Sequence, residues 1–299
     1  MRLSRRRVAA IAIALALLAA VGAFAYRFVL HGSTQLIASD PWTTSASIHS
    51  DLLGRDMPIE IFQPPQAQDC ISPPVLFLFH GSGADQGQWM AGNLGLGVGV
   101  DKIAHQLIDQ GRIRPVTIVS ALIDKSYGVD SPPSEDVWSH GPYESYITTE
   151  LIPQVDARYA VGLIAADRAI GGLSMGGFAA MNAAFRNPGM FGNVAGLSPA
   201  FFVSPPADRD WIYSGTDGRH DLLTLADEGG ADGLHLFLGH GDSDYDWVGE
   251  ATDELAARLH DHGIVVEPVV VSGGHDVATW RQLAVQMLLD LFPSGTSAC

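Results

Sequence analysis

Cysteine is scarce in this sequence, which holds only Cys70 and Cys299 among 299 residues. The two do not form a Cys-x-x-Cys spacing, so we assign neither of them a catalytic or metal-binding role. In an exported protein they could form a disulfide that ties the C-terminal tail to the loop before the second predicted strand.

Basic side chains are outnumbered, with 17 Lys and Arg against 33 Asp and Glu and a formal net charge of −16. The acidic residues are spread along the chain, and such a surface repels phosphates and anionic headgroups, which excludes nucleic acid as a partner. Internal repeats and long low-complexity tracts are absent. With 47% hydrophobic residues the chain can bury a full core, which favours one α/β domain of roughly 250 residues after an N-terminal extension.

One long apolar run stands at the N-terminus, at residues 8–26. Arg2 and three further arginines up to Arg7 precede it, and Arg27 ends it. Its length is close to the roughly 20 residues that cross a bilayer and exceeds the usual signal-peptide core, which favours an uncleaved membrane anchor with its N-terminus inside.

Two alternatives to this anchor remain open. Ala23-Phe24-Ala25 fits a small-x-small site whose cleavage would release a secreted domain. Ser4-Arg5-Arg6 is a loose match to a twin-arginine signal. Each alternative places the rest of the chain outside the cytoplasm.

The remaining sequence predicts a linker at 28–50, a catalytic domain at 51–293 and a tail at 294–299, after the leader at 1–27. Residues 35–56 are polar and rich in turn formers, so we expect them to be irregular. Beyond them, strand-like and helix-like runs alternate, which predicts a mainly parallel sheet with helices on both faces and a ligand site at the carboxyl ends of the strands. We expect strands at 57–62, 74–79, 116–122, 169–173, 193–197, 234–238 and 265–271, and helices at 100–109, 143–158, 175–185, 248–262 and 277–292.

The central motif is Gly172-Leu173-Ser174-Met175-Gly176, which matches Gly-x-Ser-x-Gly. It stands between a predicted strand and a predicted helix, the context of a nucleophile elbow. Glycine at positions 172 and 176 lets the neighbouring backbones approach closely. Ser174 is therefore the predicted nucleophile.

Two later strand ends supply the partners that a triad in the order Ser, acid, His requires. His275, between Gly274 and the last predicted helix, is the expected general base. Asp244 is the expected acid, and Asp242 in the same loop is the alternative.

A calcium loop is the other interpretation of this acidic segment. Trp247 occupies its sixth position, where that loop requires glycine, and Asp253 rather than glutamate occupies its twelfth. We therefore predict no metal.

Acyl transfer also needs donors aimed at the developing oxyanion. We expect these to be the backbone N–H groups of Met175 and of Ser82 in the turn His80-Gly81-Ser82-Gly83. Aromatic and histidine side chains at the same edge of the sheet are candidates to line the substrate pocket: His80, Trp89, Trp138, Phe201, Trp211 and Trp247.

These motifs resemble the putative esterases of the α/β-hydrolase superfamily, the group that includes esterase D, enterochelin esterase and the mycolyltransferases. The resemblance covers nearly the whole chain after the leader, and its motifs are Leu78-Phe79-His80-Gly81, Gly172-Leu173-Ser174-Met175-Gly176-Gly177, Ser198-Pro199-Ala200 and Gly274-His275-Asp276 with Trp280. It implies an α/β-hydrolase fold, Ser174 as nucleophile, His275 as base, an acid in the 242–246 loop, and no metal or organic cofactor.

The predicted activity is that of a serine carboxylic-ester hydrolase that forms an acyl-enzyme. Because no basic pair is placed to bind a phosphate or a carboxylate, we expect a neutral small-molecule, glycan or lipid ester as substrate. Two alternatives stay open: an acyltransferase that uses a sugar or lipid hydroxyl as acceptor, and a non-catalytic binding protein with a hydrolase fold. The sequence does not indicate an oligomeric state.

Overall fold

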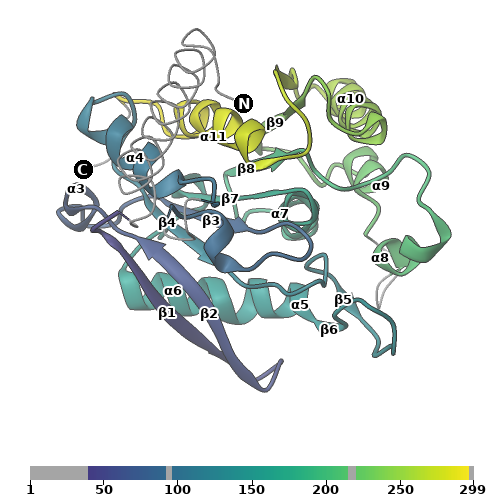
Figure 1. Ribbon diagram of the computed structural model, residues 1–299, viewed down its shortest axis with the longest axis horizontal. Helices are drawn as coiled ribbons and strands as arrows, with labels where there is room; N and C mark the ends of the chain where they lie inside the picture. Colours follow the sequence, from purple (N-terminus) through teal and green to yellow (C-terminus); the bar gives the residue numbers. More distant parts are fainter. Residues whose placement is uncertain (1–39, 92–95, 215–219, 296–299) are drawn as a thin grey trace, which may run out of the picture.

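The computed structural model describes residues 40–91, 96–214 and 220–295. In this part of the chain eight strands form one sheet in the order β1-β2-β4-β3-β7-β8-β9-β10 (Figure 1). Strands β4, β3, β7, β8, β9 and β10 run parallel, while β2 is antiparallel to both of its neighbours. The strands are β1 (Thr43–Ser50), β2 (Arg55–Phe62), β3 (Val75–Phe79), β4 (Thr117–Ala121), β7 (Arg168–Leu173), β8 (Asn193–Leu197), β9 (His235–Gly241) and β10 (Val269–Val271), with a separate pair β5 (Asp130–Ser131) and β6 (Gly141–Pro142).

Helices cover both faces of this sheet because its buried strands carry apolar side chains at consecutive positions. In β3, Val75, Phe77 and Phe79 belong to one core, whereas Leu76 and Leu78 belong to the other. The first core packs against η3, α6, α7, α9 and α10, and the second against α4 and α11. The helices are α3 (Pro65–Gln68), η2 (Gln86–Gln88), α4 (Val100–Asp109), α5 (Tyr143–Ser145), η3 (Tyr146–Leu151), α6 (Ile152–Tyr159), η4 (Ala165–Asp167), η5 (Ala207–Arg209), α7 (Met175–Arg186), α8 (Asp210–Ser214), α9 (Leu222–Asp227), α10 (Asp246–Asp261) and α11 (Val277–Leu291).

The expected strands and helices are present in the expected order, with differences at their ends. The predicted strand at 265–271 is confined to β10, which lies at an edge of the sheet. The helix expected at 143–158 is continuous through Pro153, because the π-helical η3 ends at Leu151 and places the proline in the first turn of α6.

The expectation that residues 35–56 are irregular is wrong for Thr43–Ser50. These residues form β1, which pairs antiparallel with β2 along its whole length. The sequence signal is weak because β1 is an edge strand whose side chains are mostly exposed and polar, with only Ile48 and Ser50 buried. Arg158 and Gln154 on α6 donate hydrogen bonds to the carbonyls of Ser47 and His49 on this strand.

The predicted leader at 1–27 lies outside the described residues, as do most of the linker at 28–50 and the end of the tail at 294–299, so the domain limits stay predictions. The disulfide between Cys70 and Cys299 also stays a prediction, because Cys299 is not among the described residues. None of the helices between residues 40 and 295 that the structure describes is long and apolar enough to cross a bilayer.

Candidate active site

Ser174 stands on a sharp turn between β7 and α7. Strand β7 lies near the middle of the sheet, with α7 beside it (Figure 1). Its φ of 53° and ψ of −119° lie outside the regions that ordinary L-residues prefer, which is the strained geometry of a nucleophile elbow. A Cβ on Gly172 would lie 2.1 Å from the carbonyl carbon and oxygen of Gly176, and a Cβ on Gly176 would lie 2.1 Å from the carbonyl oxygen of Phe79. Only glycine therefore fits at both positions.

His275 joins the serine to an acidic side chain. Its Nε2 lies 2.9 Å from the Ser174 Oγ, and its Nδ1 lies 2.8 Å from Asp244 Oδ1. The parallel strands explain this meeting, because the carboxyl ends of β7, β9 and β10 lie at one edge of the sheet. The structure thus brings together three residues that are 31 to 101 positions apart.

The Asp244 carboxyl is almost enclosed, with 2% of the side chain exposed. Burial alone would raise its pKa, but hydrogen bonds from His275, from the Ser198 hydroxyl at 2.6 Å and from the Tyr245 N–H at 2.8 Å outweigh burial and lower the pKa below its ordinary value. The carboxylate is therefore ionised at neutral pH and can only accept hydrogen bonds. This assigns the proton of a neutral His275 to Nδ1 and leaves Nε2 as the acceptor for the Ser174 proton.

Asp242, the alternative acid, occupies a different position. Its Oδ1 accepts hydrogen bonds from the Gly273 N–H at 3.0 Å and from the Ser243 hydroxyl at 3.1 Å. Asp242 is exposed, and the bond from Gly273 is the main cause that lowers its pKa. Its carboxylate ties the acid loop to the loop of His275 rather than contacting the imidazole.

The turn after β3 lies against the nucleophile. A Cβ on Gly81 would lie 3.6 Å from the Ser174 Cβ, and the Gly81 N–H donates to Gln88 Oε1 at 2.8 Å. Ser82 follows directly, and Met175 begins α7, so its N–H is one of the helix N-terminal donors without an intrahelical acceptor. This arrangement is compatible with the predicted oxyanion donors, whose role stays a prediction.

Three of the predicted pocket residues are buried in the interior, and their role in a pocket stays a prediction. His80 is fully buried, with Nδ1 2.9 Å from the Gly81 carbonyl oxygen and Nε2 accepting the Ile123 N–H at 3.1 Å, and burial lowers its pKa. Trp89 is also fully buried and donates to the Phe79 carbonyl at 2.9 Å. Phe201 lies in the first core. His80 and Trp89 thus brace the Gly81 turn from inside.

Two other predicted pocket residues, Trp138 and Trp211, lie in a cluster beside the first turn of α7. Trp138 and Trp211 have ring centroids 6.0 Å apart, and each contacts Tyr127, which in turn contacts Phe178 of α7. Arg209 lies 4.8 Å above the Trp138 ring.

Of the three aromatic rings that contact the imidazole within the described residues, Trp247 and Trp280 were named from the sequence and Tyr245 was missed. Tyr245 lies 5.1 Å from the His275 ring and Trp247 6.3 Å, with Phe202 4.6 Å from Trp247. Tyr245 is 56% exposed, so it presents an aromatic face to solvent next to the base. The only available signal was its place directly after the predicted acid.

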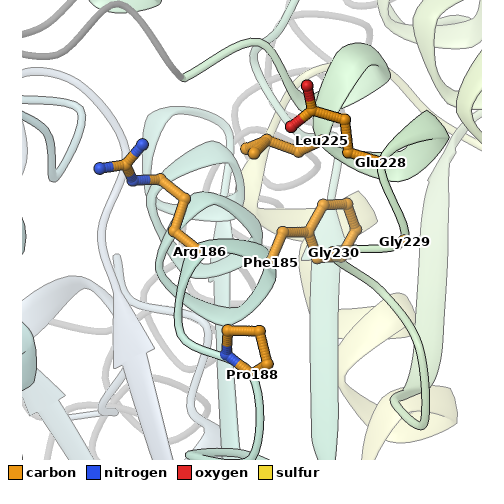
Figure 2. A pocket seen from close by; sticks show the side chains of 7 residues that line it. All are labelled: Phe185, Arg186, Pro188, Leu225, Glu228, Gly229 and Gly230. Atoms are coloured by element: carbon orange, nitrogen blue, oxygen red, sulfur yellow. The ribbon is translucent and has the colours of Figure 1, made fainter.

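A cavity of about 300 Å³ lies elsewhere, at the end of α7 opposite to Ser174 (Figure 2). Phe185, Arg186 and Leu225 contribute to its wall, and none of the three residues of the Ser174 site lines it. Within the described residues, no group of three or more His, Cys, Asp or Glu side chains could hold a metal ion.

Comparisons with known proteins give a family match and several relatives. A family model described as "Putative esterase" matches residues 50–291. An endo-1,4-β-xylanase/feruloyl esterase of Xylanibacter ruminicola is 28% identical over 73% of the chain, and an iron(III) enterobactin esterase of Escherichia coli is 30% identical over 49%. The aligned parts amount to 26% and 35% of these relatives, so the chain spans about a quarter to a third of their length.

Solved structures show the same fold. A ferulic acid esterase superposes with a TM-score of 0.69 and 22% identity, over 86% of this chain and 98% of that one. A fluorophosphonate-binding serine hydrolase of Staphylococcus aureus superposes with a TM-score of 0.66 and 19% identity, over 85% and 98%. The predicted α/β-hydrolase fold, with a mostly parallel central sheet, is confirmed.

Proposed function

This chain belongs to the putative esterase family, as its motifs indicated, and from that premise we propose that it is a serine carboxylic-ester hydrolase that acts through an acyl-enzyme. The family supports the hydrolysis of esters. The finer proposal rests on one observation: His275 reaches the Ser174 Oγ with one ring nitrogen and the buried Asp244 carboxylate with the other.

Ser174 Oγ is the attacking atom in the proposed reaction. As it bonds to the acyl carbon, His275 Nε2 takes its proton, and Asp244 stabilises the imidazolium that forms. The developing oxyanion is oriented toward the N–H groups of Met175 and Ser82. His275 then returns the proton to the leaving alcohol, and water repeats the sequence to free the acid and Ser174.

We extend the proposal to the substrate and the compartment. The exposed ring of Tyr245, with Trp247 and Phe202 behind it, offers an aromatic wall beside His275. An aromatic acyl group would stack on this wall, and the name of one relative refers to a feruloyl esterase, so esters of an aromatic acid are the substrates that we propose. The arginines and apolar run at the N-terminus support action outside the cytoplasm.

Methyl ferulate and methyl butyrate test this proposal, because they share a leaving group and differ in the acyl part. Ser174→Ala should lower turnover of both by about 10⁴ to 10⁶-fold and abolish labelling by a fluorophosphonate probe, because triad members act as a unit. Ser47→Ala is the matched control, because Ser47 is exposed on β1. This variant should change neither turnover nor labelling by the probe. Tyr245→Ala should raise KM for methyl ferulate by up to about tenfold and leave that for methyl butyrate unchanged.

Other outcomes would identify the alternatives. If Ser174→Ala keeps turnover within tenfold of the parent protein, the proposed nucleophile is wrong. An added alcohol that diverts most of the acyl group into a new ester would indicate an acyltransferase. A parent protein that neither hydrolyses esters nor reacts with the probe would be a binding protein.

A further inference from the structure

Ser198, the first residue after β8, connects Asp244 to the last helix. Its hydroxyl lies 2.6 Å from Asp244 Oδ2 and 3.1 Å from the Trp280 indole nitrogen on α11. An indole N–H only donates and an ionised carboxylate only accepts, so the directions of both bonds are fixed. Trp280 donates to Ser198, and Ser198 donates to Asp244.

Ser198 is buried in a backbone conformation that is unfavourable for residues other than glycine. Ser198 is fully buried, and its φ of 45° lies in the left-handed region that side chains other than glycine disfavour. Its N–H donates to the Gly239 carbonyl at 2.7 Å, which anchors it to the strand that leads into the acid loop. Glycine would adopt this backbone more easily, so the hydroxyl is the feature that distinguishes the residue present.

Trp280 contacts the site twice. Its indole N–H holds Ser198, and its ring lies 5.1 Å from the His275 ring at an interplanar angle of 84°, in an edge-on contact. Trp280 is buried, so both contacts are enclosed. One side chain of α11 thus fixes the imidazole by packing and the acid through a hydrogen bond.

We propose that Ser198 and Trp280 are positioning residues that hold the Asp244 carboxylate in the orientation from which it binds His275. The Ser198 hydroxyl donates a hydrogen bond to Asp244 Oδ2. The other oxygen, Oδ1, then accepts from the His275 imidazole and from the Tyr245 N–H. Without the Ser198 hydroxyl, the carboxylate can rotate and the imidazole loses its fixed partner. The inference rests on the proposed function, since it assigns these two residues to the same triad.

Ser198→Ala in the full-length protein is the first test, with kcat, KM and the pH profile of kcat/KM measured on methyl ferulate. Loss of a hydrogen bond to a charged group should lower kcat by about tenfold to a hundredfold with KM nearly unchanged. A carboxylate that is free to rotate attracts the imidazolium less strongly, so the acidic limb of the profile should move down by as much as about one pH unit. Trp280→Phe keeps the ring against His275 and removes only the N–H, so a smaller change in the same direction is expected.

Ser50→Ala is the matched control. Ser50 is also fully buried, accepts the Leu53 N–H at 3.0 Å and donates to the Glu150 carboxylate, but it lies at the end of edge strand β1. Ser50→Ala should lower the melting temperature by about as much as Ser198→Ala does, because each variant loses a buried hydrogen bond to a carboxylate. It should leave kcat and the pH profile unchanged. Ser198→Gly removes the hydroxyl, and glycine adopts the left-handed backbone at this position more easily. This variant therefore shows the effect of the lost hydrogen bond to Asp244 without a loss of folding.

The inference is overturned if Ser198→Gly and Ser198→Ala fold and match the parent enzyme in kcat and pH profile, or if Ser50→Ala shifts the profile equally. Loss of the proposed function itself would look different, because Ser174→Ala would then remain active. An inactive Ser174→Ala beside an unchanged Ser198→Ala contradicts the positioning role alone.

Discussion

Asp244→Asn is the change that tests the candidate site most directly. The Asp244 Oδ1 to His275 Nδ1 distance is 2.8 Å, and two unit charges at this separation attract by about 6 kcal/mol at an effective dielectric constant of about 20. In the proposed reaction the imidazolium exists only after Ser174 has lost its proton, so this attraction favours the transition state over the ground state. Its loss should reduce kcat by about 10⁴-fold. Asparagine has the same shape, so the folded structure should persist.

Asp242→Asn is the control for this experiment. Asparagine keeps the carbonyl oxygen that accepts the Gly273 N–H, and Asp242 is exposed, so kcat should change by no more than about twofold. Steady-state hydrolysis of methyl ferulate by the two variants and the parent enzyme, with melting temperatures measured alongside, gives the comparison. If folded Asp242→Asn loses as much activity as Asp244→Asn, then Asp244 is not the acid and the reasoning from the static contacts fails.

Two further predictions concern stability. Gly172→Ala should destabilise the protein by about 4 kcal/mol or more, because the new Cβ would lie 2.1 Å from backbone atoms of Gly176; denaturant unfolding measures this, and a variant as stable as the parent would show that the elbow can open. The folded state lowers the pKa of Asp244, so its stabilising contribution is complete above the unfolded value of about 3.9 and is lost as pH falls through the lower folded value. The unfolding free energy should therefore fall more steeply below about pH 4 in the parent than in Asp244→Asn, and equal slopes would contradict the lowered pKa.

Much of the fold could be predicted because the buried strands consist of unbroken apolar runs. Residues such as Val75–Phe79 are buried on both faces, which gives them a composition that no loop shares. The edge strand β1 lacks this signal. Thr43–Ser50 exposes most of its polar side chains, so its composition resembles that of a loop. Only its pairing with β2 makes it a strand.

The sequence by itself determined the elements whose chemistry is local. Gly172 is required by its contact with Gly176 within the turn, and the order serine, acid, histidine follows from the order of the strands. These features depend on neighbours along the chain or on a simple alternation. A reader of the sequence can therefore find the loops that carry the candidate site.

Only the tertiary structure decided which side chains meet. Asp242 and Asp244 are two residues apart in one loop, and sequence alone cannot tell that the first turns to Gly273 and the second to His275. Ser198 and Trp280 are 82 positions apart, yet they share a hydrogen bond next to the acid. The physical reason is that hydrogen bonds depend on distances of a few ångströms and on direction, which are set by how the sheet twists and how α11 packs on it. Apolar periodicity specifies burial, but it does not specify partners.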